Sequence, residues 1–144
     1  MKIAIDFDGT VVSYAFPDIG HDIGAVPVLK KLVAAGHKLI LNTMRCGKLL
    51  EAAVNWFKEN DIELYGVNED PGQKEWTQSP KVFANLYIDD AALGCPLVYP
   101  VGGFLPGEDK SDRPYVDWER VQEIFAENNV YKSPDPVINN EENK

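Results

Sequence analysis

The chain has 144 residues, the usual size of a single domain, and 44% of them are hydrophobic, so one core can form without disulfides. Its formal net charge of −9 argues against broad electrostatic binding to nucleic acid or to an anionic membrane. No apolar run approaches the roughly 20 residues that span a bilayer, and no signal-peptide pattern opens the chain, so the sequence predicts a cytoplasmic protein.

The first half of the chain alternates short apolar runs with amphipathic segments. Residues 2–6 form an apolar run that ends in an acid, which is typical of a buried strand, and residues 11–24 predict a loop. Apolar residues at helical spacing predict a helix over 25–35. A second strand is expected over 37–43, and a second amphipathic helix over 48–59.

The second half continues the alternation. A third strand is expected over 62–67 and another over 85–89, which again ends in carboxylates. A Gly- and Pro-rich stretch over 94–114 precedes a final helix over 118–127. Strands alternating with helices predict an α/β, three-layer Rossmann-like fold, with a mostly parallel central sheet and helices on both faces.

One domain accounts for most of the chain. Residues 1–132 are predicted to form it, and residues 133–144 are polar enough to predict a flexible C-terminal tail. The longest candidate insertion, residues 11–24, is too short for a substantial lid. The sequence therefore leaves no room for a large cap domain.

Two carboxylates close the first predicted strand, in the segment Asp6-Phe7-Asp8-Gly9-Thr10. Residues i and i+2 of a strand point to the same side, so both carboxylates can face the crevice beyond the strand ends, where ligands bind. Carboxylates this close repel unless a cation or a shared proton intervenes. Gly9 allows a sharp turn whose N–H groups could hold a phosphate, and a solvated turn is the alternative explanation.

A second acidic pair closes the strand predicted over 85–89, in Tyr87-Ile88-Asp89-Asp90. Two strands that end in carboxylates place up to four acids at one edge of a parallel sheet. Oxygen ligands together with water suit Mg²⁺ best, so the sequence predicts a magnesium site there. Two exposed acids at the start of a loop are the alternative.

Three further side chains could serve the same crevice. Thr43 closes the second predicted strand and could offer its hydroxyl, and Lys81 could neutralise both the carboxylates and a phosphoryl group. Arg45 could reach a substrate group. The alternatives are a structural threonine, an ordinary surface lysine and an exposed arginine at a helix start.

The ordered set Asp6-x-Asp8-Gly9-Thr10, Thr43, Lys81 and Asp89-Asp90 resembles the four motifs of the haloacid dehalogenase superfamily, most of whose members are phosphatases. The resemblance spans positions 6 to 90. The segments 41–45 and 81–93 look like those of short bacterial and phage members. The resemblance implies that residues 1–132 form a hydrolase domain of the superfamily type without a cap domain.

The resemblance also implies roles for individual residues. Asp6 would attack the phosphorus to give an aspartyl-phosphate, and Asp8 would be the general acid and then the base. Asp8 favours phosphoryl transfer over dehalogenation, because a halide leaves without a proton. The residues implied to contact the phosphoryl group or substrate are Gly9, Thr10, Thr43, Arg45 and Lys81. Those implied to hold Mg²⁺ are Asp6, the backbone carbonyl of Asp8, Asp90 as the direct ligand, and Asp89 on the metal or its waters.

The expected substrate is a phosphorylated small molecule or a phosphorylated macromolecule. The acidic charge makes nucleic acid an unlikely partner, and a neighbouring subunit of a homo-oligomer could help to enclose a small substrate. From another functional class, the chain could be a catalytically silent phosphate- or protein-binding module of the same fold. A phospho-receiver domain fits less well, because its acidic pair comes early and its phosphorylated Asp lies mid-chain.

Overall fold

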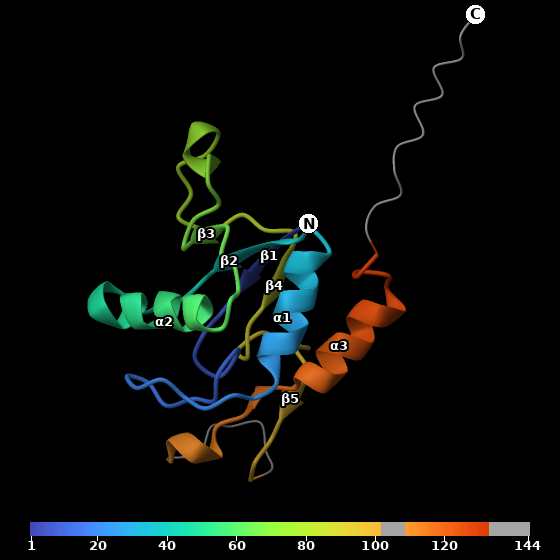
Figure 1. Cartoon of the computed structure of the whole chain (residues 1–144). Coiled ribbons are helices and arrows are strands. Elements are labelled where there is room, and N and C mark those ends of the chain that lie inside the picture. The colour runs from blue at the N-terminus through green and yellow to red at the C-terminus, as the bar shows by residue number, and fades with distance from the viewer. Residues whose placement is uncertain (102–108, 133–144) are drawn as a thin grey trace, which may run out of the picture.

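A four-stranded parallel sheet forms the centre of the computed structural model, which describes residues 1–101 and 109–132 (Figure 1). Its strands, in the spatial order β3-β2-β1-β4, are β3 (Gly66–Val67), β2 (Lys38–Leu41), β1 (Lys2–Ile5) and β4 (Leu86–Ile88). The parallel pairing confirms the predicted α/β, Rossmann-like fold. The tail predicted over 133–144 lies outside the described residues.

Three α-helices accompany the sheet: α1 (Ala25–Ala34), α2 (Gly47–Glu59) and α3 (Trp118–Glu127). Their bounds lie within one residue of those predicted from apolar spacing. The start of α3 is stabilised because the Asp117 side chain accepts a hydrogen bond from the Arg120 backbone N–H. Among the described residues, no helix combines the length and apolarity that crossing a membrane would need.

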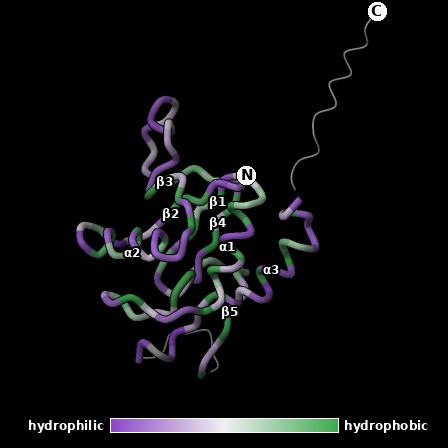
Figure 2. The backbone as a smooth tube through the Cα atoms, viewed as in Figure 1, coloured by the Kyte–Doolittle hydropathy of each residue, from purple (hydrophilic) through white to green (hydrophobic). Residues whose placement is uncertain are grey.

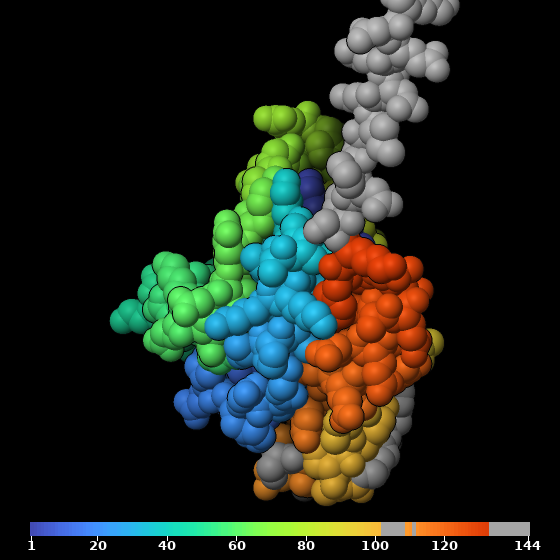
Figure 3. Space-filling model, turned by 45° about the vertical axis from the view of Figure 1, so that its right-hand side comes forward, coloured from blue at the N-terminus to red at the C-terminus, as the bar shows by residue number. Residues whose placement is uncertain are grey.

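One face of the sheet holds the main core. Ile3 and Ile5 of β1 point to this face together with Leu39 and Leu41 of β2, because alternate residues of a strand share a side. The buried residues of all three α-helices join the same cluster, and α1 and α3 lie side by side (Figure 3). Figure 2 shows that hydrophobic residues concentrate in this interior, while hydrophilic residues gather in the peripheral turns. This face therefore supplies most of the apolar burial that stabilises the fold.

The opposite face has a much smaller core, formed by Ala4, Ile40 and Val82. Val82 belongs to the segment between β3 and β4, which contains the 3₁₀ helix η1 (Gln73–Glu75). The buried Gln73 side chain ties this segment together by donating to the Lys81 carbonyl and accepting from the Phe83 N–H. Within residues 1–101 and 109–132, α-helices thus cover one face of the sheet, and the short helical turn η1 accompanies the other.

A small antiparallel hairpin lies within the stretch for which the sequence predicts no strand. It pairs β5 (Leu97–Val98) with β6 (Tyr115–Val116), and η2 (Lys110–Asp112) precedes β6. The Val116 N–H donates to the Gly9 carbonyl at 3.0 Å, which fixes the hairpin to the first acidic loop. Strands of two residues that pair across 17 positions leave no local periodicity, so the sequence could not reveal them.

Candidate functional site

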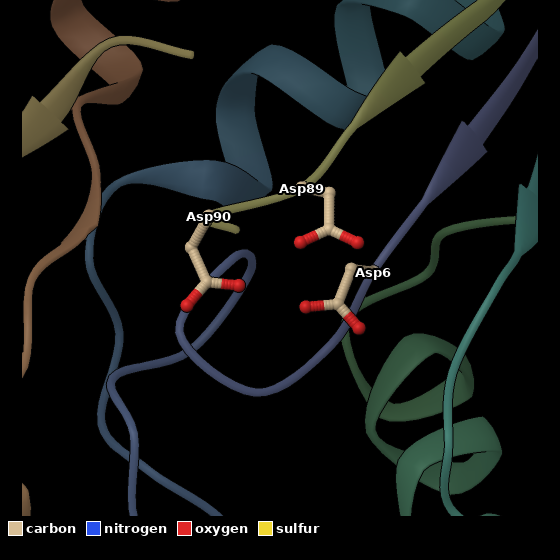
Figure 4. Close-up of side chains that lie close together, drawn as sticks. All are labelled: Asp6, Asp89 and Asp90. Carbon is tan, nitrogen blue, oxygen red and sulfur yellow. The ribbon is translucent and has the colours of Figure 1, made fainter. Parts of the chain in front are cut away.

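The strand register brings the two predicted acidic segments together. Ile5 of β1 pairs with Ile88 of β4, so the residues that follow them, Asp6 and Asp89, leave the sheet side by side. The Asp6 N–H donates to the Ile88 carbonyl at 3.0 Å and extends this pairing by one residue. Figure 4 shows the side chains of Asp6, Asp89 and Asp90 pointing toward one another at the carboxyl ends of the two strands. The sequence prediction of acids gathered at this edge is met.

Three carboxylates form the centre of this site. One oxygen from each of Asp6, Asp89 and Asp90 lies within 4.8 Å of the other two, and all three side chains are partly buried. The fully buried Thr10 lies between two of them: its hydroxyl donates to Asp6 Oδ2 at 2.9 Å, lies 3.2 Å from Asp90 Oδ1 and accepts from the Asp90 N–H at 3.1 Å. This hydroxyl fixes the relative positions of the two acids.

The carboxyl of Asp6 is the most perturbed group of the site. Burial, and then the charge of Asp89, raise the pKa of Asp6 from 3.8 to about 8. Hydrogen bonds from the Phe7 N–H and the Thr10 hydroxyl act in the opposite direction but are weaker. Burial likewise raises the pKa of Asp90. The cluster therefore resists holding its full negative charge without a compensating cation.

These residues fit a divalent cation of the magnesium type. The donor set consists of hard carboxylate oxygens, which Mg²⁺ prefers, and the described cluster contains no cysteine or histidine that would favour zinc. The raised pKa of Asp6 means that its carboxylate form is favoured only where a proton or a cation offsets the charge of the cluster. When bound, Mg²⁺ would supply Lewis-acid polarisation and charge neutralisation for a phosphoryl group.

Asp8 does not join the three carboxylates. Its carboxylate makes a bidentate ion pair with Arg45, at 2.8 Å from Oδ2 to Nε and 2.7 Å from Oδ1 to Nη2. The prediction that Asp6 and Asp8 face the same crevice assumed a continuous strand, but β1 ends at Ile5 and the Phe7 carbonyl already accepts turn hydrogen bonds. The alternation of a strand therefore no longer decides where Asp8 points.

Arg45 is placed differently from the prediction that it reaches substrate. Its side chain is 1% exposed, and all five guanidinium N–H groups are used. Two go to Asp8, and three go to the backbone carbonyls of Pro17, Asp18 and Leu49. The guanidinium also lies 5.1 Å from the centroid of the Phe7 ring and 5.3 Å from that of the Phe16 ring. Arg45 thus ties the 11–24 loop to Asp8 and α2, and has no N–H left for a phosphate.

In the turn after Asp8, two of the N–H groups that were predicted to contact phosphate have acceptors within the protein, and the predicted phosphate contacts of this turn and of Thr10 stay predictions. The Gly9 N–H donates to the Val12 carbonyl at 2.9 Å, and the Thr10 N–H to the Phe7 carbonyl at 3.1 Å. Gly9 instead allows a close approach: its φ is +77°, and a Cβ there would lie 2.5 Å from Asp90 Oδ2. Both residues help to assemble the acids in this structure.

Thr43 and Lys81 make no hydrogen bond or ion pair with the three carboxylates in the described part of the chain. The Thr43 hydroxyl accepts from the Arg45 N–H at 3.1 Å, and the Thr43 N–H donates to Asn68 Oδ1 at 2.8 Å. The exposed Lys81 ammonium lies 5.5 Å from the centroid of the Tyr87 ring, and in the part of the chain that is described it pairs with no carboxylate. The predicted phosphoryl contacts of both side chains stay predictions.

Sequence reasoning missed one residue that positions the site. The buried indole Nε1 of Trp118, the first residue of α3, donates to the Thr10 carbonyl at 2.7 Å. This bond joins residues 108 positions apart in the sequence. A tryptophan at the start of an amphipathic helix predicts a core residue, so no local signal marks this role.

Comparisons with known proteins identify one similar structure. No protein-family model matches the chain, and no protein of curated function is similar to it. A solved structure of a conserved protein from Bacteroides thetaiotaomicron shares 36% sequence identity with it and superposes with a TM-score of 0.68. The match covers 89% of this chain and 91% of that protein. With this identity over nearly the whole of both chains, the chain belongs to the same family as this conserved Bacteroides protein.

Proposed function

We propose that this chain is a magnesium-dependent phosphohydrolase that cleaves phosphomonoesters through an aspartyl-phosphate on Asp6. One observation carries the proposal: Asp6, Asp89 and Asp90 converge at the carboxyl ends of neighbouring parallel strands, where α/β folds bind ligands. The resemblance of the ordered motifs to the haloacid dehalogenase superfamily supports the same reaction.

The reaction follows from what the side chains can do. An Asp6 oxygen attacks the phosphorus, the bond from phosphorus to the leaving oxygen breaks, and that oxygen takes a proton. Water then attacks the phosphorus of the aspartyl-phosphate, gives up a proton, and releases inorganic phosphate and free Asp6. Asp6, Asp89 and Asp90 would hold Mg²⁺. Thr10 keeps Asp6 and Asp90 in position throughout.

Asp8 is the proposed proton carrier, and its contact with Arg45 limits that role. Both Asp8 oxygens accept N–H groups from Arg45 in this structure. We infer that Asp8 turns away from Arg45 before it carries a proton to a leaving group. We therefore expect aryl phosphates, whose leaving oxygen needs little help from an acid, to be cleaved faster than alkyl phosphates.

The test is release of inorganic phosphate from 4-nitrophenyl phosphate with Mg²⁺. Asp6→Asn should abolish turnover, because the amide cannot attack phosphorus. Asp61→Asn is a matched control, since Asp61 is exposed and follows α2 at the far edge of the sheet. Undiminished turnover by the Asp6→Asn protein would refute the mechanism, as would equal loss in the two variants.

A second candidate, a catalytically silent phosphate-binding module, is favoured by a specific observation. Asp8 is occupied by Arg45, and the Lys81 ammonium lies over Tyr87, so neither contacts the three carboxylates. If the chain is a catalytically silent module, it should bind Mg²⁺ but release phosphate from no ester. A panel of phosphomonoesters and phosphopeptides, measured alongside Mg²⁺ binding by calorimetry, separates the two functions.

A further inference from the structure

A cavity of about 330 Å³ adjoins the acidic cluster on the side of Asp90. This volume is within the range of small-molecule sites. Its walls are largely apolar, formed by Leu93, Leu97, Tyr99 and Pro114, and one cationic side chain, Arg113, lines it. Asp90 belongs to both the cavity and the cluster. The cavity therefore adjoins the cluster at which the proposed reaction takes place.

Two contacts hold Arg113 beside the site. Its guanidinium lies over the Tyr14 ring, 4.0 Å from the centroid, and Tyr14 belongs to the loop that follows the first acidic segment. Three residues later, the Val116 N–H donates to the Gly9 carbonyl. The chain is thus held at Arg113 itself and three residues after it, at the end of the molecule toward which β1 and β4 point (Figure 1). A guanidinium stacked on a ring keeps its N–H edge for an anion.

The other cations that were candidates for substrate binding are placed elsewhere. Arg45 uses all its N–H groups on Asp8 and on backbone carbonyls, and Lys81 lies over Tyr87. Lys110, near Arg113 in sequence, donates to the Phe16 carbonyl. Among the described residues that line the cavity, Arg113 alone carries a positive charge. An anionic group in this acidic environment would gain most from contact with that guanidinium.

We propose that this cavity is the leaving-group subsite and that Arg113 binds a second anionic group on the substrate. The inference rests on the proposed function and narrows its substrates to phosphomonoesters with a flat, apolar leaving group that bears an acid. The apolar walls accept the flat part, because its burial removes apolar surface from water. Arg113 accepts the acid through charge-assisted hydrogen bonds.

The test measures binding of two probes in the presence of Mg²⁺ by calorimetry: phenylphosphonate and 3-carboxyphenylphosphonate, neither of which can be hydrolysed at the P–C bond. We expect the carboxylated probe to bind the wild-type chain about tenfold more tightly, as one charge-assisted contact allows. Arg113→Met should bring the two affinities within about twofold of each other, and Arg113→Lys should keep part of the difference. Arg120→Met, at an exposed arginine on α3, is the control and should keep the full difference.

The outcomes separate this inference from the proposed function. Equal affinity of the wild-type chain for both probes would overturn it, as would full discrimination by a folded Arg113→Met variant. If the Arg113→Met variant fails to fold, the affinities of the wild-type chain and of the Arg113→Lys variant for the two probes still test the inference. Discrimination that depends on Arg113, with no turnover of phenyl phosphate or 3-carboxyphenyl phosphate, would support the subsite and reject the hydrolase.

Discussion

Asp6 is buried beside two other acids, and this raises its pKa to about 8. In the unfolded chain the same carboxyl titrates near 3.8, so between these values the folded state holds a proton that the unfolded state has lost. The stability of the metal-free protein should therefore fall as pH rises from about 4 to about 8, and level off above that.

Denaturant melts of the metal-free protein at pH 5 and pH 8.5 test this slope. Asp6→Asn removes the buried charge, so it should raise stability at pH 8.5 by on the order of 2 kcal/mol and flatten the dependence on pH. Asp61→Asn should leave the slope as it is. If the wild-type protein became more stable toward pH 8.5, the assignment of a raised pKa to the buried Asp6 carboxyl would be contradicted.

Gly9 and Gly36 offer a matched pair of backbone tests. Both have positive φ, +77° and +91°, but a Cβ at Gly9 meets Asp90 at 2.5 Å, whereas nothing lies within 4 Å of one at Gly36. Substitution by Ala should destabilise the fold at either position by roughly 1 kcal/mol through backbone strain. Only Gly9→Ala should also weaken Mg²⁺ binding, by displacing Asp90. Equal Mg²⁺ affinity in the two variants, measured by calorimetry, would show that Asp90 can bind the metal without the close approach of Gly9.

At the scale of elements, Arg45 joins the first acidic segment, the 11–24 loop and α2. Arg45→Met should destabilise the fold by roughly 3 kcal/mol, because it leaves the mostly buried Asp8 carboxylate unpaired. Arg120→Met provides the contrast: its pair with Glu123 is about half exposed on both sides, so its loss should lower the stability of the fold far less.

A double-mutant cycle gives the coupling between Arg45 and Asp8. Asp8→Asn in the Arg45→Met background should recover part of the lost stability, since the amide carries no charge to bury. Urea melts of the four proteins measure this term. Additive effects of the two substitutions would indicate that Arg45 acts through the loop carbonyls alone.

The elements of the main core were predictable because each has its own local pattern. The helices over 25–34, 47–59 and 118–127 follow apolar spacing, and β1 follows an uninterrupted apolar run. β5 and β6 were not predictable, because their pairing depends on contacts between distant residues. The sparse cover of the second sheet face also escaped prediction, since alternation of strands and helices does not say which face a short crossover segment can fill.

At the scale of the whole molecule, Mg²⁺ should stabilise the fold if Asp6, Asp89 and Asp90 bind it as proposed, because it would offset clustered charge in a chain whose net charge is −9. At a concentration 100 times its dissociation constant, Mg²⁺ would add about 2.7 kcal/mol at pH 8.5. The gain should be much smaller at pH 5, where the metal must displace the proton from Asp6. Thermal melts with NaCl at equal ionic strength control for general screening of the acidic surface. If NaCl raised the stability by a similar amount, the gain with Mg²⁺ would no longer be evidence for a specific metal site.

The meeting of Asp6, Asp89 and Asp90 was predictable from sequence, because parallel strands that end in acids deliver them to one edge. The orientation of Asp8, Arg45 and Lys81 was not. Arg45 closely follows a strand, which suggested a substrate contact. The position of its side chain depends, however, on hydrogen bonds to the carbonyls of Pro17 and Asp18, which are placed only when the loop folds. Arg113 lines its cavity because it lies just before β6 of the hairpin, and no sequence motif predicts that hairpin.

The central position of β1 has a consequence for the order of folding. β1 pairs with β2 over about 36 intervening residues, but with β4 over more than twice that separation, so the second pairing closes the longer loop. Asp89 and Asp90 arrive beside Asp6 only with β4. We therefore expect the electrostatic repulsion of the site to arise late in folding, after β1 and β2 have paired. Divalent cations should consequently slow the escape of β4 from the sheet, a kinetic role separate from any reaction at phosphorus.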